Sequence, residues 1–213
     1  MTTVNKVEQI ENYLEELYPN PKCELEYSKD YELLLATMLS AQTTDKRVNQ
    51  VTRVLFCKYP SLQALKDAPR EDIEEIIKPI GTYQRKSLYV KEIATIIVDQ
   101  YGGKTPSDRK ILESLPGVGH KTVNVFLSNI YDVPAIAVDT HVERVSKRLG
   151  LAKKDDSVLA VEKKLEKYFD PSVWGRRHHQ LVLFGRYHCK SMKPECDSCK
   201  LQEICKYYKT LKK

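Results

Sequence analysis

The segment Leu115-Pro116-Gly117-Val118-Gly119-His120-Lys121 sets the architecture of this chain, because it breaks a helical pattern with a short turn. Glycine adopts positive φ readily and lets another backbone come close. A short helix capped by Ser107 is expected up to Leu115, and a second helix from Lys121 to about Ile130. The first N–H groups of the second helix point outward at the positive end of its dipole, where a phosphate binds well. The pattern is typical either of a phosphate-binding hairpin or of an ordinary tight turn between helices.

Lys121 stands in the first turn of the expected helix, where the helix dipole disfavours a cation by about 0.3–1 kcal/mol. Next to a phosphate-binding turn, such a lysine is either a second phosphate contact or a nucleophile. The plain alternative is a surface lysine that extends into water. Further along, the apolar segment Ala135–Val138 leads to Asp139, which is predicted to cap a helix through Leu149. A capping carboxylate is held rigidly, so the same residue can also take part in chemistry.

Helical periodicity extends over most of the chain. Apolar residues recur at steps of three and four from Val4 to Leu17, which predicts an amphipathic helix. Further helices are expected after Asp30, Ser61 and Arg70, and a separate one is expected to be capped by Asp45. Three more are expected over about 83–100, 157–168 and 172–187. No alternating run is long enough to predict a strand. The expected fold class is therefore all-α, with a boundary near Pro134.

Size and composition limit what the chain can do. Its 213 residues, 41% of them hydrophobic, suffice for one large domain or two small ones with a sizeable core. The longest strictly apolar stretches have four residues, far fewer than the roughly 18 that cross a bilayer, and no secretory signal is visible. The first 34 residues hold three lysines and eight acids, whereas the remainder carries a net charge of +11. This basic body is compatible with a polyanionic partner, although surface charge is most often simply solvated.

The chain has six cysteines, and four of them follow the spacing C-x6-C-x2-C-x5-C. These four are Cys189, Cys196, Cys199 and Cys205. Without an export signal the thiols meet a reducing compartment, where such a cluster indicates metal ligation more often than disulfides. Four thiolates suit either zinc or an iron–sulfur cluster, and the spacing does not separate the two. Cys23 and Cys57 are expected to be buried free thiols.

Three features together resemble the endonuclease III family of base-excision DNA glycosylases. They are the turn at 115–121 with its lysine, the segment Ala137-Val138-Asp139-Thr140-His141, and the four-cysteine spacing. Matching segments elsewhere are Leu39-Ser40-Ala41-Gln42 with Thr44-Asp45, Ile80-Gly81-Thr82-Tyr83, and His178-His179 through Phe184-Gly185-Arg186-Tyr187. The resemblance thus extends over nearly the whole chain.

The resemblance implies two helical domains with DNA in the cleft between them. A six-helix barrel would span residues 23–133 and contain a helix-hairpin-helix motif at about 107–130. Residues 1–22 and 134–213 would form the second domain, with a 4Fe-4S cluster on the four cysteines of the 189–205 loop. His178 and His179 are expected to serve packing or a polar network rather than to bind metal.

The same resemblance implies a bifunctional DNA glycosylase and AP lyase of base excision repair. Such an enzyme removes oxidised pyrimidines from duplex DNA and cleaves the strand 3′ to the abasic site by β-elimination. Lys121 would be the nucleophile that forms a Schiff base with the sugar, and Asp139 would assist proton transfer. The implied DNA-binding residues are Gln42, Thr82, Gly117, Val118, Gly119 and His120.

Two of these positions depart from the family pattern. Gln42 matches the family residue that would fill the gap left by a flipped base. Thr82 would be a second wedge, and it departs because better-known relatives have a larger aliphatic residue there. His120 replaces the arginine that is common before the catalytic lysine, which predicts a weaker, pH-sensitive contact.

The implied partner is double-stranded DNA with damaged bases or abasic sites, and the implied enzyme is a monomer without membrane attachment. It would work in the cytoplasm, associated with the nucleoid of a prokaryote. The alternatives are a non-catalytic helix-hairpin-helix DNA-binding protein and a mismatch-specific glycosylase of the same superfamily. The mismatch enzymes usually depart from lysine at the position of Lys121.

Overall fold

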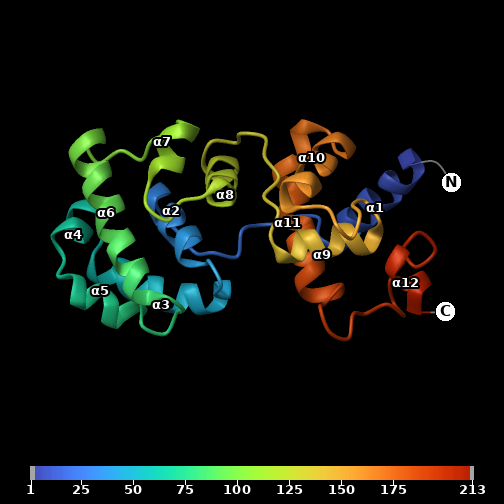
Figure 1. Ribbon diagram of the computed structural model, residues 1–213, viewed down its shortest axis with the longest axis horizontal. Coiled ribbons are helices and arrows are strands. Elements are labelled where there is room, and N and C mark those ends of the chain that lie inside the picture. The colour runs from blue at the N-terminus through green and yellow to red at the C-terminus, as the bar shows by residue number, and fades with distance from the viewer. Residues whose placement is uncertain (1–2, 212–213) are drawn as a thin grey trace. The chain divides into compact units, whose positions relative to one another are not determined.

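The computed structural model describes residues 3–211, and every regular element within them is helical, which confirms the predicted all-α class (Figure 1). The chain divides into two compact units. One consists of residues 23–131, and the other combines residues up to 22 with those from 132 onward. No helix in the described part of the chain is long and apolar enough to cross a membrane.

The unit of residues 23–131 is built around a buried helix, α2. Its helices are α2 (Asp30–Leu39), α3 (Asp45–Lys58), α4 (Leu62–Asp67), α5 (Arg70–Ile77), α6 (Tyr83–Tyr101), α7 (Arg109–Ser114) and α8 (His120–Ile130). Residues 31–39 of α2 are all buried, and α2 packs against α3 and α8. The helices α4 and α5 pack against α6, which ends at Gly102 in the left-handed conformation (φ 59°). The predicted stop at this glycine is confirmed.

Two helix caps differ by one residue from the prediction. Thr44, rather than Asp45, caps α3, because its hydroxyl accepts a hydrogen bond from the N–H of Arg47 at 3.4 Å. Asp108, rather than Ser107, caps α7 through a 3.0 Å bond from the N–H of Ile111. In both places two capping residue types stand next to each other in the sequence, and the pattern alone does not select between them.

The second unit joins the first helix to the C-terminal part of the chain. Its α-helices are α1 (Thr3–Leu17), α9 (Thr140–Leu149), α10 (Val158–Tyr168), α11 (Trp174–Leu183) and α12 (Lys206–Leu211). The predicted helix over 172–187 is divided into a 3-10 turn at Pro171–Val173, then α11, then a π-helical turn at Phe184–His188. Apolar side chains of α1, α9, α10 and α11 share one core, in which Ile10, Leu14 and Phe184 are almost fully buried.

Ion pairs hold α1 against α11. Glu15 accepts a hydrogen bond from Nε of Arg176 at 2.8 Å and also contacts Arg177, whose side chain is only 8% exposed. Arg177 in turn donates to Gln180 at 2.5 Å, and Gln180 donates to the carbonyl of Tyr18 at 3.0 Å. The Arg176 hydrogen bonds, more than any other cause, lower the pKa of Glu15 to about 2.

We expect Glu15→Gln to lower the free energy of unfolding at pH 7 by about 1 kcal/mol, since the charged form is the one that the arginines stabilise. The carboxyl is 35% exposed, so solvent screens part of the effect that the pKa shift implies. A lowered pKa stabilises the fold above the ordinary pKa of 4.5, and that contribution is lost as the pH falls toward about 2. Urea unfolding at pH 7, 5 and 3 should therefore show the two proteins converging at low pH.

Glu16→Gln is the matched control, because Glu16 pairs with Lys200 where both side chains are more than half exposed. It should change stability by a few tenths of a kcal/mol at most, as exposed pairs do. Equal losses for the two variants, or a difference at pH 3 as large as at pH 7, would contradict the assigned role of Glu15.

Candidate active site and cysteine pocket

The turn between α7 and α8 has the geometry that its glycines allow. Gly117 has φ 73°, and a Cβ there would lie 2.4 Å from Cδ2 of Tyr89, so no other residue fits without movement. Val118 is 5% exposed, and its N–H donates to the carbonyl of Leu115 at 3.1 Å. Gly119 has extended backbone, and a Cβ there would meet no atom within 4 Å. The turn is thus anchored inward by Val118 and open to the outside at Gly119.

Lys121 lies in the first turn of α8, and its side chain is exposed. The six residues that follow it, 122–127, are all buried. Phe126 is fully buried and belongs to the core that includes Leu33 and Leu34 of α2. The amine therefore extends from the amino end of a helix whose body is fixed in the core.

His120 is held between α7 and α8 by polar side chains. Its Nδ1 lies 3.5 Å from Oε1 of Glu113, and its Nε2 lies 3.3 Å from Nδ2 of Asn124. Arg109 closes the group, because it donates to Asn124 at 2.8 Å and to Glu113 at 3.3 Å. These contacts brace both sides of the turn next to Lys121. The sequence offers a signal for them only in the charged residues of the short α7.

Gln42 and Thr82 share an unusual backbone conformation. Their φ angles are 58° and 55°, and within residues 23–131 they are the two residues other than glycine with positive φ. Both side chains are exposed. A left-handed conformation costs a residue with a Cβ roughly 1–2 kcal/mol, and such strain is concentrated at functional sites. The two strained positions are the ones that the sequence predicts to probe the DNA.

Asp139 is the N-cap of α9, as predicted. Its Oδ1 accepts hydrogen bonds from the N–H groups of His141 at 2.9 Å and Val142 at 2.8 Å. The preceding residues 135–138 are buried, and Nδ1 of buried His178 lies 2.8 Å from the carbonyl of Ala137. His178 thus serves a polar network, which confirms the expectation for it. Burial lowers the pKa of neighbouring His179 to about 4.

All four cysteines of the C-terminal loop line one pocket. His188, Phe184 and Tyr208 also line it. Burial, followed by the neighbouring thiols, raises the pKa of Cys196, and burial raises that of Cys199 to about 11. Four thiolates in this pocket therefore need a compensating cationic group. Among residues 3–211, no three His, Cys, Asp or Glu side chains are arranged to hold a single metal ion.

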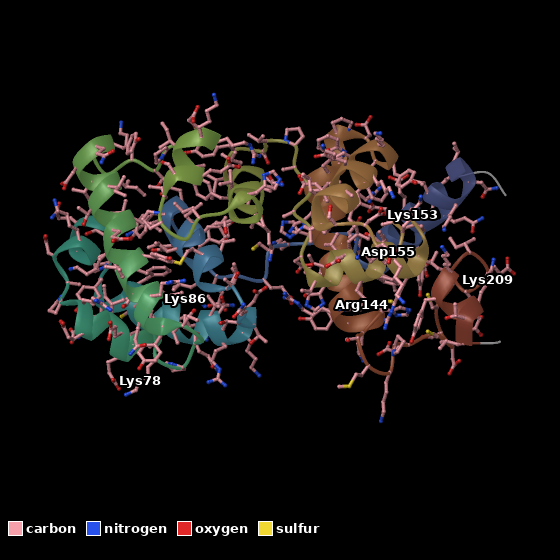
Figure 2. All side chains as sticks on the ribbon, viewed as in Figure 1. Lys78, Lys86, Arg144, Lys153, Asp155 and Lys209 are labelled. Carbon is pink, nitrogen blue, oxygen red and sulfur yellow. The ribbon has the colours of Figure 1, made fainter. Side chains whose placement is uncertain are left out.

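Two further observations fit a sulfur-containing group in this pocket. Nε2 of His188 is buried and has no hydrogen-bond partner in the described part of the chain, and His188 lines the pocket. A buried nitrogen of this kind is normally satisfied, and an inorganic sulfide is a suitable partner. Two arginines of α9 hold the loop. Arg144, labelled in Figure 2, donates to the carbonyl of Gly185 at 2.6 Å, and Arg148 donates to that of Lys190 at 2.6 Å.

The two remaining cysteines lie outside this pocket. Cys23 is partly buried and packs against the core of residues 23–131. Cys57 is exposed near the end of α3, so the expectation of a buried thiol is wrong there. The inward face of α3 is formed by Val48, Val51 and Leu55, and Cys57 lies on the other face.

Comparison with known proteins identifies the relatives of the chain. Residues 35–171 match the family described as HhH-GPD superfamily base excision DNA repair protein. Endonuclease III of Bacillus subtilis is 45% identical over 206 residues, which cover 97% of this chain and 94% of that protein. The chain belongs to the endonuclease III family. Endonuclease III of Escherichia coli is 40% identical over 96% of this chain and 97% of the relative.

Solved structures agree with this membership. A trapped endonuclease III–DNA covalent intermediate superposes with a TM-score of 0.95 at 44% identity and covers all of both chains. A thermostable thymine-DNA glycosylase shares the fold, with a TM-score of 0.86 at 23% identity. The predicted family is confirmed, and the chain is a base excision repair protein whose predicted enzyme class, DNA glycosylase and AP lyase, is that of endonuclease III.

We expect Gly117→Ala to lower the free energy of unfolding by about 1–3 kcal/mol, because the new Cβ requires positive φ and meets the ring of Tyr89. Gly119→Ala is the matched control, since its Cβ enters open space at an ordinary backbone conformation. Chemical denaturation should place the control within about 0.5 kcal/mol of the wild type. A Gly117→Ala protein as stable as the control would show that the turn is not constrained in this way.

Proposed function

We propose that this endonuclease III family member removes oxidised pyrimidines from duplex DNA and cleaves the strand through a Schiff base on Lys121. The observation that carries the proposal is the exposed Lys121 in the first turn of α8, directly behind the Gly117–Gly119 turn. A cation there is unfavourable for the helix, so stability does not explain its place. The relative trapped as a covalent intermediate with DNA supports the same chemistry.

The Lys121 amine attacks C1′ of the damaged nucleotide and forms a bond to that carbon. The glycosidic bond breaks, its electron pair leaves with the base, and the base takes up a proton. The sugar ring opens to an iminium, which acidifies C2′. Loss of the C2′ proton then forms a double bond to C3′ and expels the 3′ phosphate, so that the strand is cleaved.

Asp139 assists the proton transfers and stabilises positive charge that develops on the sugar. Its cap bonds to His141 and Val142 hold the carboxylate in one orientation, which suits a group that must act without rearranging. The second oxygen, Oδ2, takes no part in these two bonds. A carboxylate fixed in this way can cap α9 and serve the reaction together.

The turn at Gly117, Val118 and Gly119 holds the DNA backbone near the reacting nucleotide. Its outward side leads to the amino end of α8, where backbone N–H groups and the helix dipole favour a phosphate. Val118 contributes through the backbone, because its side chain is buried. His120 adds a contact that depends on its protonation. A sugar inside a duplex is reachable only after the nucleotide is flipped out, and a firm hold on the backbone supports that step.

Gln42 fills the space left by the flipped base, and Thr82 acts as a second, smaller wedge. Both side chains are exposed on strained turns, which is the placement that a probing group needs. The threonine leaves more room than a larger aliphatic side chain, so base preference follows mainly from Gln42. The unit of residues 23–131 is then the barrel domain, which carries the hairpin and both wedges.

The second unit is the cluster domain, and its four cysteines hold a 4Fe-4S cluster. The shared pocket and the buried nitrogen of His188 support this assignment. When bound, such a cluster supplies a rigid, cationic iron core for the thiolates and stabilises the loop. From residue 186 to the end, the chain has eight Lys and Arg against three acids, so the ordered loop suits a phosphate backbone. We further propose that the chain acts as a monomer in the cytoplasm; the solved endonuclease III–DNA complex supports DNA as its partner.

Borohydride trapping tests the nucleophile. Wild-type protein mixed with an abasic-site duplex should give a covalent adduct, and Lys121→Ala should lower its yield roughly a thousandfold or more. Lys110→Ala on α7, which also removes an exposed lysine, is the matched control and should trap normally. If the wild type gives no adduct, the Schiff-base mechanism fails, and a non-catalytic DNA-binding protein or a mismatch-specific glycosylase is favoured instead. Equal trapping by Lys121→Ala would assign the nucleophile elsewhere.

Asp139→Asn separates the cap from the chemistry in the same assay. Asparagine caps helices about as well as aspartate, so the variant should unfold at nearly the wild-type denaturant concentration. Its rate of adduct formation should nevertheless fall, because the charge is gone. An unchanged rate would reduce Asp139 to a structural cap.

Removal of a thiol tests the cluster. Cys199→Ser should lose most of its iron and the visible absorption of protein purified without oxygen, since four ligands are needed. Cys57→Ser, which changes an exposed cysteine outside the pocket, should keep both at the wild-type level. Zinc in place of iron in the wild type would contradict the 4Fe-4S assignment.

A further inference from the structure

One buried lysine connects the two strained turns that carry the proposed wedges. Lys86 lies on α6, one helical turn after Thr82, and is 4% exposed (Figure 2). Its own N–H donates to the carbonyl of Thr82 at 3.0 Å. Lysine is almost never buried without a partner, so its contacts require an explanation.

The ammonium of Lys86 reaches the turn that follows α2. Nζ donates to the carbonyl of Leu39 at 2.8 Å and to that of Ala41 at 2.7 Å, and lies 3.3 Å from Oγ1 of Thr43. These three oxygens surround Gln42 in the sequence, with two before it and one after it. Burial lowers the pKa of Lys86, and the three oxygens compensate for part of the lost hydration.

We propose that Lys86 is a positioning residue: its side chain holds the turn of Gln42 in its left-handed conformation, at a fixed place relative to Thr82 one helical turn earlier, ready for the DNA. This inference rests on the proposed roles of Gln42 and Thr82. The side chains of Gln42 and Thr82 are themselves exposed, so neither residue anchors its own turn in the core. The ammonium of Lys86 anchors the turn of Gln42 through the carbonyls of Leu39 and Ala41. The backbone of α6, on which Lys86 lies, begins at the turn of Thr82 and sets the spacing between the two turns.

A second lysine of α6 makes similar contacts to a turn that carries no proposed wedge residue, and it serves as a control. Lys91, five residues later on α6, donates from Nζ to the carbonyls of Lys66 at 2.8 Å and of Ala68, at the end of α4. It therefore binds the end of a helix as Lys86 does. The residues of that turn have no positive φ, and none is assigned to DNA. A comparison of the two lysines separates the general effect of losing such a contact from the effect on the wedges.

The test measures binding of the full chain to two duplexes that differ at one position. One carries a tetrahydrofuran abasic-site analogue, and the other is undamaged. We expect Lys86→Met to reduce the preference for the abasic duplex about tenfold, while affinity for the undamaged duplex stays near the wild-type value. Lys91→Met should keep the wild-type preference even though it also loses stability. If Lys86→Met does not fold, Lys86→Gln carries the same expectation.

A double-mutant cycle tests whether Lys86 acts through Gln42. In a Gln42→Ala background, Lys86→Met should cause little further loss of preference, because the group that it positions is already gone. Additive losses would overturn the inference, as would a Lys86→Met protein that keeps the wild-type preference. If the inference about Lys86 is overturned but the wild type still forms the covalent adduct with abasic DNA, the proposed lyase function stands. A wild type that neither prefers abasic DNA nor traps on it overturns both.

Discussion

A helix with a buried body and an exposed amino end is the constraint on which the rest of the site depends. In α8, residues 122–127 are buried, and α8 packs against α2, which is itself buried along most of its length. Burial of Phe126 alone contributes about 1.5–3 kcal/mol, more than the 0.3–1 kcal/mol by which the dipole disfavours Lys121. The core therefore tolerates an amine where helix stability opposes it, and keeps that amine in one place.

The same core carries strain at two other positions. The left-handed conformations of Gln42 and Thr82 cost roughly 1–2 kcal/mol each, and the turns that contain them lie at the ends of α2 and at the start of α6. Residues 31–39 of α2 are all buried and α6 is buried along one face, so the ends of these helices cannot shift to relieve the strain. Rigid helices with strained, exposed turns are suited to probing a partner, because the probing group does not have to be ordered on contact.

The sequence predicted the helices and the chemistry better than the contacts between them. Periodicity and caps are local, so the helix capped by Asp139 and the stop at Gly102 were predictable. The role of Lys86 was not, because its partners lie more than 40 residues away and a lysine between polar neighbours on a helix normally faces water. The π-helical turn at Phe184–His188 also escaped prediction, since its residues continue a helical pattern. Long-range packing decides such features, and periodicity does not report it.

The helices α8 and α9 carry charged groups of opposite sign, Lys121 and Asp139, at their amino ends. Comparing them separates a contribution to helix stability from a role in the reaction. Asp139 at the start of α9 is favourable for its helix, and Lys147 and Arg148 in its last turn are favourable too. Capping therefore accounts for Asp139 completely, whatever else it does. Lys121 at the start of α8 opposes its helix and has an exposed side chain. Helix stability explains the carboxylate of Asp139 but not the amine of Lys121, so the case for a chemical role is stronger at Lys121. The chemical role of Asp139 depends on how the reaction rate changes when its charge is removed and its helix cap is kept.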